Sequence, residues 1–530
     1  MPGEPETPLC TSPRDRHHGR VEIATETERK YDVPETFELP DLVGVGGIAG
    51  VDGAETHDLD ATYFDTEDLR LMRNRRTLRQ RSGGNDAGWH LKTPGDGDGR
   101  TEHRLPANGD EVPAELTALV RAIVRRHPLG PVARLRTHRV ETPLRDADGR
   151  TLALVAQDRV TADSDGTQTV WQEVEVELVD GDVAVLDEVE RRLFDAGASP
   201  AQGPSKVARA LADRLAAAKA GATTKPGATT KPGTTAKSAT AKSATAKSGT
   251  TKSGTARSKK PEPQVNPVIL YAREQRDAIL SHDPAARRGE PRAVHQMRVA
   301  TRRLRSTLKT YKKVFDANDV RDELRWLAGV LGAVRDPQVL EEKLLGLVDE
   351  AGPEFAHTAQ RVRAHLEHRI GTGRAELAEA LESDRYLDLL DRIDELVDRD
   401  SPRTPDPVKR ARKVLAKADA TLDAALASGV EEEIHESRKG FKQARYAVEL
   451  IAPSAGEPAK RLVKALTNLQ DGLGDYQDSN IARGVLRELG GDSFHFGVLY
   501  GRQEQVGREA LAGVPALARA ARRRKVRRVF

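Results

Sequence analysis

The chain has 530 residues, with 85 lysines and arginines against 82 aspartates and glutamates, and aromatic residues make up 4% of it. This length suits two or three domains, and the near balance of charge makes the placement of charges more informative than their total. The single cysteine, Cys10, excludes an internal disulfide, and the lack of a long apolar run argues against a membrane span.

Residues 1–20 contain no apolar core of the kind found in secretory signals. We expect a disordered leader there and a cytoplasmic protein. Residues 21–215 then show the alternation and β-branched residues typical of strands, as in ATYFDT and TVWQEVEVELV. Helical patterns interrupt them near PAELTALVRAIVRRH and VAVLDEVERRLFDAG.

Charged side chains recur at every second residue of several predicted strands, so that each set lies on one face of its strand. The sets are Glu26, Glu28 and Lys30; Arg79 and Arg81; and Glu173, Glu175 and Glu177. A single row of this kind is usually a solvated sheet face. Several rows of both signs instead favour a barrel that turns them inward as a polar tunnel.

The chemistry of such a tunnel is specific. Clustered carboxylates cannot all ionise without a cation between them, and Mg²⁺ or Mn²⁺ binds through oxygen ligands. Arginines facing them would hold phosphate oxygens through paired donors. The sequence shows no P-loop and no zinc-ligand spacing, so a metal-assisted reaction on phosphates is predicted.

A low-complexity stretch over residues 216–263 repeats alanine, threonine, lysine, proline, glycine and serine, without an acidic residue between Lys219 and Lys260. It cannot bury enough apolar surface to fold, and we expect a flexible cationic linker. Residues 264–520 are then rich in amphipathic helical patterns. Residues 521–530 form a basic tail that either extends an anion-binding surface or frays.

Two helices of this second half carry a stripe of basic residues. The first stripe consists of His295, Arg298, Arg302, Arg305 and Lys309, and the second of His435, Arg438, Lys442 and Arg445. Spacings of three and four residues keep each stripe on one helix face. LGAVRD and LGDYQD follow at matching distances, which indicates an internal repeat and a pseudo-twofold bundle. A lone basic stripe is usually solvated, but its duplication favours an anion-binding surface.

Residues 21 to about 215 resemble a CYTH domain, of the triphosphate tunnel metalloenzyme family. The resemblance rests on Glu26-Thr27-Glu28-Arg29-Lys30, which matches the E-x-E-x-K motif, followed by YFDT, LRQR, LKTP, RTE, THRVE, AQDRV, EVEVE and Ser205-Lys206 in the family's order. It implies an eight-stranded antiparallel β-barrel with a charged tunnel. Members hydrolyse inorganic triphosphate or thiamine triphosphate, or cyclise ATP.

The resemblance also implies roles for single residues. Triphosphate would be bound by Arg79, Arg81, Lys92, Arg139 and Lys206, and metal by Glu26, Glu28, Glu173, Glu175 and Glu177, with Asp158 as a further helper. Lys30 would position phosphate or water beside the carboxylates of Glu28 and Glu175.

Residues from 265 to about 520 resemble a CHAD domain through VHQMRVATRRLRS, LGAVRD, IHESRKGFKQARYAVE and LQDGLGDYQD. The resemblance implies an all-helical domain of two related bundles that binds polyphosphate. Arg302, Arg303 and Arg305 would be first contacts, with His295 and His435 at the helix starts.

The sequence therefore predicts an α+β multidomain protein in which a divalent-metal-dependent triphosphatase precedes a polyphosphate-binding module, with possible residence at polyphosphate granules. An adenylate cyclase is the rival enzyme, although no adenine pocket is evident. A protein that binds polyphosphate or nucleic acid with negligible turnover is the rival of another class, and the absence of an aromatic stacking platform disfavours nucleic acid.

Overall fold

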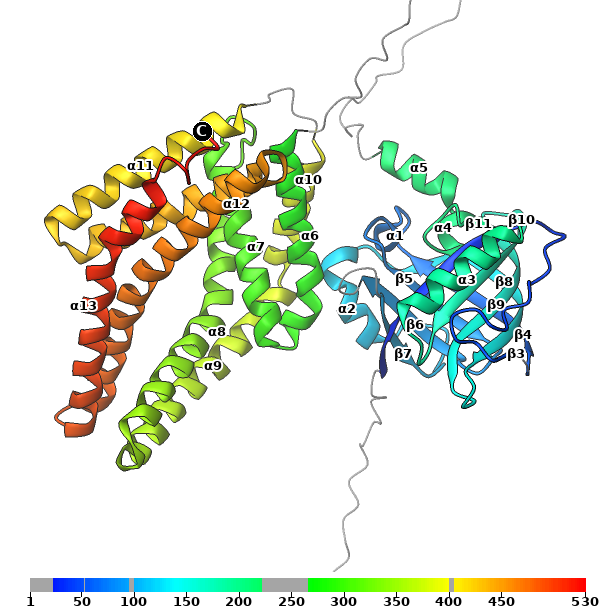
Figure 1. The fold of residues 1–530 in the computed structure, drawn as a ribbon, viewed down its shortest axis with the longest axis horizontal. Coiled ribbons are helices and arrows are strands. Elements are labelled where there is room, and N and C mark those ends of the chain that lie inside the picture. The colour runs from blue at the N-terminus through cyan, green and yellow to red at the C-terminus, as the bar shows by residue number, and fades with distance from the viewer. Residues whose placement is uncertain (1–21, 52, 95–99, 222–265, 400–404) are drawn as a thin grey trace, which may run out of the picture. The chain divides into compact units, whose positions relative to one another are not determined.

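The structure is a computed structural model that describes residues 22–51, 53–94, 100–221, 266–399 and 405–530 (Figure 1). The chain divides into two compact units, Met1–Gly221 and Ala222–Phe530. The expected leader and most of the expected linker lie outside the described residues. The start of that linker is helical instead, because α5 (Ala212–Gly221) continues beyond residue 215.

The first unit is built on one antiparallel sheet (Figure 1). Its strands follow the order β1–β7–β6–β5–β4–β8–β9–β10–β2–β11, and β3 pairs with β8. The bounds are β1 (Glu22–Glu26), β2 (Glu28–Val33), β3 (Gly50–Val51), β4 (Glu55–Asp65), β5 (Thr77–Ser82), β6 (Gly88–Pro94), β7 (Arg100–Leu105), β8 (Gly130–Arg145), β9 (Thr151–Ser164), β10 (Thr167–Leu178) and β11 (Ser199–Pro200).

The two ends of this strand order are consecutive parts of the chain. Only Thr27 separates β1, which pairs with β7, from β2, which pairs with β10. The Thr27 carbonyl accepts a hydrogen bond of 3.0 Å from the amide of Leu178 at the end of β10. The sheet is therefore wrapped into a barrel-like form by one interrupted strand. If β1 and β2 are taken together and the two-residue strands left aside, the long strands match the expected eight.

Helices cover the apolar outer face of the sheet. Besides α5, this unit contains α1 (Arg70–Arg73), α2 (Ala114–Val124), α3 (Val183–Asp195) and α4 (Lys206–Ala210). The side chain of Asp182 caps α3, whose Val185 and Val189 pack on Val174 and Val176 of β10. Because side chains alternate along a strand, this outward packing of valines turns the intervening glutamates of EVEVE toward the barrel interior.

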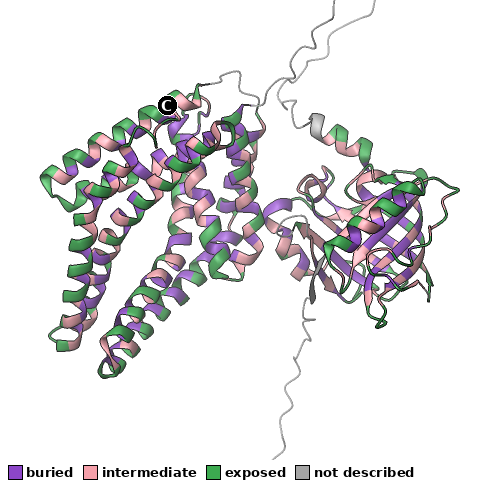
Figure 2. Cartoon of the chain, viewed as in Figure 1, coloured by how far each residue is buried: buried purple, intermediate pink, exposed green. Residues whose placement is uncertain are grey.

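The second unit is helical (Figure 1). It contains α6 (Pro267–Arg287), α7 (Pro291–Thr310), α8 (Asn318–Ala351), the 3₁₀ turn η1 (Pro353–Phe355), α9 (Ala356–Glu382), α10 (Asp384–Asp398), α11 (Pro407–Ser428), α12 (Glu431–Gly490) and α13 (Phe494–Arg522). Apolar stripes form its core, and Figure 2 shows buried residues alternating with exposed ones along these helices. Met297, Leu304, Leu308, Tyr311 and Phe315 are all buried in this core.

The internal repeat is visible in how the helices pack. Helices α6 to α9 pack in sequence, and α11, α12 and α13 do the same. Gly456 interrupts α12 with a φ of 63°, a conformation that glycine adopts without strain. This kink falls where the first repeat has the turn between α7 and α8, so the two halves of α12 correspond to those two helices. None of the helices in the described part of the chain has the length and apolar character needed to cross a membrane.

Candidate functional site

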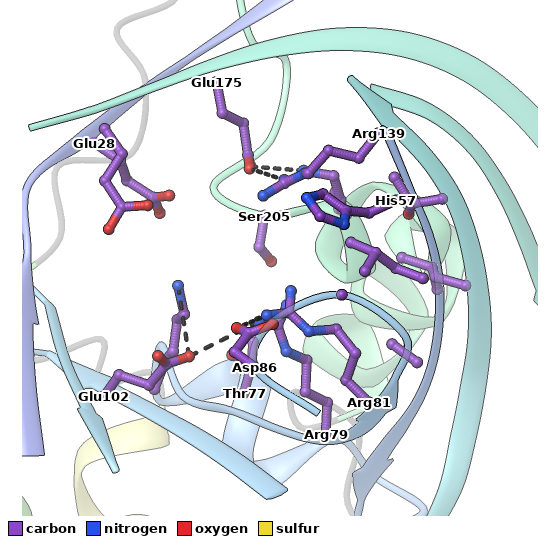
Figure 3. A pocket seen from close by; sticks show the side chains of 18 of the residues that line it. Glu28, His57, Thr77, Arg79, Arg81, Asp86, Glu102, Arg139, Glu175 and Ser205 are labelled. Atoms are coloured by element: carbon purple, nitrogen blue, oxygen red, sulfur yellow. Dashed lines mark hydrogen bonds and ion pairs between the residues drawn. The ribbon is translucent and has the colours of Figure 1, made fainter. Parts of the chain in front are cut away.

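A charged cavity of about 320 Å³ lies inside the sheet of the first unit (Figure 3). Its basic lining residues are Lys30, Arg79, Arg81, Lys92, Arg100, Arg104, Arg139 and Lys206, and its acidic ones are Glu28, Asp86, Glu102, Glu141, Glu175 and Glu177. They come from six different strands, from the turn between β5 and β6, and from the start of α4. We call this space the tunnel cavity.

Strand register brings the two signs of charge together. On neighbouring strands Glu175 lies opposite Lys30, and Arg139 lies opposite Asp158. In antiparallel sheets such directly opposed side chains are close neighbours. Two of the charged rows recognised in the sequence, those of β2 and β10, therefore lie opposite each other on paired strands.

Lys206 is the centre of the most buried ion-pair network. Its Nζ lies 2.9 Å from Asp158, 2.7 Å from Glu173 and 2.6 Å from Glu175. Arg139 donates two hydrogen bonds to Asp158, of 2.8 and 2.7 Å, and a third of 2.7 Å to Glu175. Ser205, which precedes Lys206, caps α4 by accepting from the amide of Ala208, and this fixes where α4 begins.

These ion pairs decide the protonation of the carboxylates. Burial alone would raise the pKa of Glu175, but Lys206, Lys30 and Arg139 outweigh it and hold that pKa well below its usual range. Burial likewise opposes ionisation of Asp158, and Lys206 and Arg139 lower its pKa overall. Both groups are therefore anionic at neutral pH.

Lys30 links Glu28 to this network. Its Nζ lies 3.0 Å from Glu28 and also bonds Glu175. Burial would raise the pKa of Glu28, but the ammonium of Lys30 lowers it overall. Glu28 and Glu175 therefore project as carboxylates from one wall of the tunnel cavity (Figure 3).

The other side of the tunnel cavity carries the cations Arg79, Arg81 and Lys92. Arg79 lies 3.8 Å from Glu102 and donates a hydrogen bond of 3.4 Å to Tyr63. The Nζ of Lys92 is 3.7 Å from Glu102. Burial, together with the neighbouring Arg79 and Arg139, lowers the pKa of Arg81 to about 9. Positive charge is thus concentrated where a bound anion would relieve the repulsion.

Three buried carboxylates, Asp158, Glu173 and Glu175, place one oxygen each within 4.8 Å of one another and could hold a metal ion. An oxygen-only donor set suits Mg²⁺ or Mn²⁺. Among the described residues, Asp158 and Glu173 are not part of the lining of the tunnel cavity. Both contact Lys206, which does line the cavity. Glu28, Glu175 and Glu177 line the cavity itself.

The structure thus brings all five expected triphosphate ligands, Arg79, Arg81, Lys92, Arg139 and Lys206, to one cavity. The backbone of Glu26 lies in β1, but its side chain is outside the described residues. Sequence reasoning missed Asp86, Arg104 and Glu141 in the lining. Glu141 follows Arg139 at strand spacing and could have been found, whereas Asp86 lies in a turn and carries no such signal.

In the second unit the two predicted stripes meet at one cavity of about 540 Å³, which we call the basic groove. Its charged lining consists of Arg302, Arg305, Lys309, Arg325, His435, Arg438, Lys439 and Lys442, without an aspartate or glutamate among the described lining residues. Burial and then Arg302, Arg438 and Arg298 lower the pKa of Lys442 to about 6. Residues 140 apart in sequence therefore share one field of positive charge.

Three stripe residues and the predicted first contact Arg303 lie outside the lining of the basic groove. Arg298 forms a bidentate pair with Asp336 of LGAVRD. Arg303 lies 2.9 Å from Glu449, and Arg445 lies 3.6 Å from the same residue. His295 is the fifth residue of α7, and partial desolvation, followed by the nearby Arg335 and Arg298, lowers its pKa.

A second hollow of about 740 Å³ adjoins the basic groove and shares Lys309, Lys439 and Gln443 with it. Its other basic residues are Lys312, Arg321, Arg410, Lys413 and Lys417. The last three lie on α11 at spacings of three and four, which is a third stripe that the sequence analysis did not single out. Arg522 and Arg527 of the predicted basic tail instead bind Asp419, so this part of the tail is folded onto α11.

Comparison with known proteins identifies both units. The CYTH domain model matches residues 24–211, and the CHAD domain model matches residues 270–487. Two uncharacterised proteins of Mycobacterium tuberculosis, from strains CDC 1551 and H37Rv, are 37% identical over 517 residues, which cover 90% of this chain and 92% of each relative. The chain belongs to the family of proteins in which a CYTH domain is followed by a CHAD domain, as the sequence motifs predicted.

Solved structures similar to this chain include PptA from Streptomyces chartreusis, which is 19% identical with a TM-score of 0.42 and matches 48% of this chain and 98% of its own. The CHAD domain from the plant Ricinus communis is 24% identical with a TM-score of 0.37, over 48% of this chain and 88% of its own. The CYTH family includes divalent-metal-dependent triphosphatases.

Proposed function

We propose that the first unit hydrolyses inorganic triphosphate, or a related short organic triphosphate, with Mg²⁺ or Mn²⁺. The observation that carries this proposal is that Arg79 and Arg81 lie across the tunnel cavity from Glu28 and Glu175 (Figure 3). A short phosphate chain has enough negative charge to satisfy Arg79, Arg81 and Lys92 together, and its oxygens meet the carboxylates of the other wall through metal.

Each group then has a distinct task. Arg79, Arg81 and Lys92 bind and orient the chain, while Arg139 and Lys206 exchange part of their carboxylate contacts for phosphate oxygens as charge develops in the reaction. Glu28, Glu175 and Glu177 hold the metal from the cavity side, and Glu26 of β1 is a further proposed ligand. Bound metal would supply charge neutralisation and a more acidic water molecule. Lys30 keeps Glu28 and Glu175 ionised and oriented.

The test is phosphate release by the full-length protein from triphosphate, thiamine triphosphate, ATP, diphosphate and long polyphosphate, with Mg²⁺, with Mn²⁺ and with chelator. Triphosphate should be cleaved fastest, and chelator should abolish turnover. Full activity in chelator would exclude the metal role. If the protein forms cyclic AMP from ATP faster than it releases phosphate from triphosphate, it is an adenylate cyclase instead.

For the second unit we propose binding of inorganic polyphosphate along the basic groove. The supporting observation is that two stripes, one from each repeat, line the same cavity, and that seven lysines and arginines belong to its lining. A linear polyanion can span both stripes and continue into the hollow beside α11, since the two spaces share Lys309 and Lys439. Such binding would place the protein at polyphosphate granules.

A binding titration of the full-length protein, made catalytically inactive by chelator, should show affinity for long polyphosphate that falls steeply with salt as counterion release requires. Replacing Arg302, Arg438 and Lys442 together with glutamine should abolish most of it. Equal affinity for DNA at matched charge and near-physiological salt would favour the rival reading of a general nucleic-acid binder, and retained binding by the triple variant would remove the groove from the site.

A further inference from the structure

One turn of the first unit reaches into the tunnel cavity. Residues 83–87 connect β5 to β6, and Gly84, Asn85 and Asp86 of this turn line the cavity. A turn between neighbouring strands lies at the rim of a barrel, so these residues stand at one mouth of the tunnel. The mouth is the one next to Arg81, because Arg81 is the penultimate residue of β5.

The turn is held in place by close packing. Gly83 has a φ of 79°, and a Cβ at this position would come within 2.0 Å of the carbonyl oxygen of Asp58 on β4. The imidazole of His90 is 2% exposed, with Nε2 2.8 Å from the backbone oxygen of Asp86 and Nδ1 3.1 Å from Glu102. The backbone of Asp86 is therefore tied to a buried residue that also contacts Glu102, the carboxylate beside Arg79 and Lys92.

The side chain of Asp86 forms an ion pair with Arg81 (Figure 3). The Arg81 side chain is 9% exposed and the Asp86 side chain 31% exposed. Arg81 lies in the field of Arg79 and Arg139, so a carboxylate here occupies the position where an anionic group of the substrate would be most stabilised. The carboxylate carries a single charge and comes from the protein itself.

We propose that Asp86 is a specificity-determining residue, an internal carboxylate at Arg81 that the end of a short phosphate chain must displace and that repels any longer chain passing through this mouth. The proposal rests on the proposed triphosphatase function. It names the substrate class of the tunnel as triphosphate rather than tetraphosphate and longer chains. Long chains held by the second unit would then not be threaded past Asp86.

Two effects of removing the charge follow. Asp86→Asn keeps the size of the side chain but no longer competes for Arg81, so the KM for triphosphate should fall while kcat stays within about twofold. The like-charge repulsion at the mouth is also lost. The ratio of kcat/KM for tetraphosphate to kcat/KM for triphosphate should therefore rise about tenfold, the order expected for one partly buried like charge.

The experiment measures this ratio in the full-length wild type, Asp86→Asn, Asp86→Glu and Asp163→Asn, each checked for folding by circular dichroism. Asp86→Glu keeps the charge and should keep the wild-type length preference. Asp163 is an exposed aspartate on β9 outside the cavity lining and is the matched control. Binding of triphosphate and tetraphosphate in chelator, followed by calorimetry, gives a second readout that needs no turnover.

The outcomes separate the two proposals. The role of Asp86 is supported if only Asp86→Asn shows a higher ratio of kcat/KM for tetraphosphate to kcat/KM for triphosphate, and if its calorimetric affinity for tetraphosphate rises in parallel. A wild type that cleaves triphosphate while Asp86→Asn keeps the same ratio and the same affinities overturns this inference and leaves the triphosphatase standing. A wild type that neither cleaves nor binds triphosphate overturns both. A loss of kcat in folded Asp86→Asn, without a change in the ratio, would show a structural role for the turn only.

Discussion

The ammonium nitrogen of Lys206, at the start of α4, lies 2.6 Å from a carboxylate oxygen of Glu175 on β10. Each of the two groups keeps the other charged inside the barrel, because Lys206 lowers the pKa of Glu175, and Asp158 and Glu175 together raise the pKa of Lys206 against the effect of burial. The pair therefore contributes to stability as well as to the site, and the two contributions can be measured separately.

Lys206→Met should lose triphosphate turnover and also lower the free energy of unfolding by about 3 kcal/mol, as expected when one partner of a buried ion pair is removed. Chemical denaturation of the first-unit transition measures this, with the exposed Arg191→Gln as control. A variant that is inactive but as stable as the wild type would mean that the carboxylates do not depend on Lys206.

The loss of unfolding free energy in Lys206→Met should depend on pH with a definite sign. The lowered pKa values of Asp158 and Glu175 give stability that is present above their unfolded values of about 4 and is lost as pH falls through the folded values. The raised pKa of Lys206 gives stability present below about 10.4 and lost as pH rises further. The deficit of Lys206→Met should thus be largest between about pH 5 and 9 and shrink in acid. An equal deficit at pH 3 would contradict this linkage.

Glu28→Gln should abolish metal-dependent turnover, by about 10²-fold or more, while leaving the melting temperature nearly unchanged. The reason is that Lys30 keeps its second partner, Glu175, when Glu28 loses its charge. Activity over a Mg²⁺ and Mn²⁺ titration is the measurement, and Glu111→Gln, at an exposed position, is the control. Restoration of wild-type rate by excess metal would show weakened metal binding, whereas full activity at low metal would remove Glu28 from the site.

Adjacent arginines on α7 should behave oppositely. Arg302→Gln should weaken polyphosphate binding about tenfold, because Arg302 lines the basic groove and burial beside Arg298 and Arg438 lowers its pKa. Arg303→Gln should leave affinity within about twofold but lower stability, since Arg303 pairs with the half-buried Glu449. Calorimetric titration with thermal unfolding distinguishes them, and similar losses of affinity in both variants would refute the assignment.

Polyphosphate binding should weaken as pH rises from 6 to 8. Lys442 is largely neutral above its pKa of about 6, and a bound phosphate chain raises that pKa, so binding takes up a proton. Lys442→Arg should bind more tightly at pH 8 and lose most of this dependence. The measurement is a binding titration at each pH, at constant ionic strength, with long polyphosphate chains, because such chains have few terminal phosphates. His435→Gln is the control for the nearby imidazole. A wild-type affinity that is constant over this range would contradict the prediction.

Strand and helix periodicity was sufficient to predict which charges share a face, and the family motifs predicted the two domains. Arg79, Arg81, Lys92, Arg139 and Lys206 accordingly meet at one cavity. Periodicity says nothing about which partner a charge finds on another element. Arg298 and Arg302 belong to the same stripe, yet Arg298 pairs with Asp336 and Arg302 lines the groove.

Turns were beyond prediction for a similar reason. The position of Asp86 depends on glycine conformations and on a tertiary contact with His90, and neither leaves a periodic pattern. The α11 stripe of Arg410, Lys413 and Lys417 did leave one. It could not be distinguished from an ordinary solvated helix face until α7 and α12 were seen beside it.

The break at Thr27 has a consequence for how the first unit is made. β2 cannot pair until β10 has been made. The register places Lys30 of β2 opposite Glu175 of β10, which lies 145 residues later in the chain. Such non-local pairing is slow to form, and β2 is synthesised long before β10, the strand with which it pairs. A tag or partner protein bound to β1 and β2 during synthesis would therefore delay closure of the tunnel until well after the other strands have paired. Deleting the chain up to Thr27 would remove Glu26 of the E-x-E motif together with β1, whose pairing with β7 joins the two ends of the strand order.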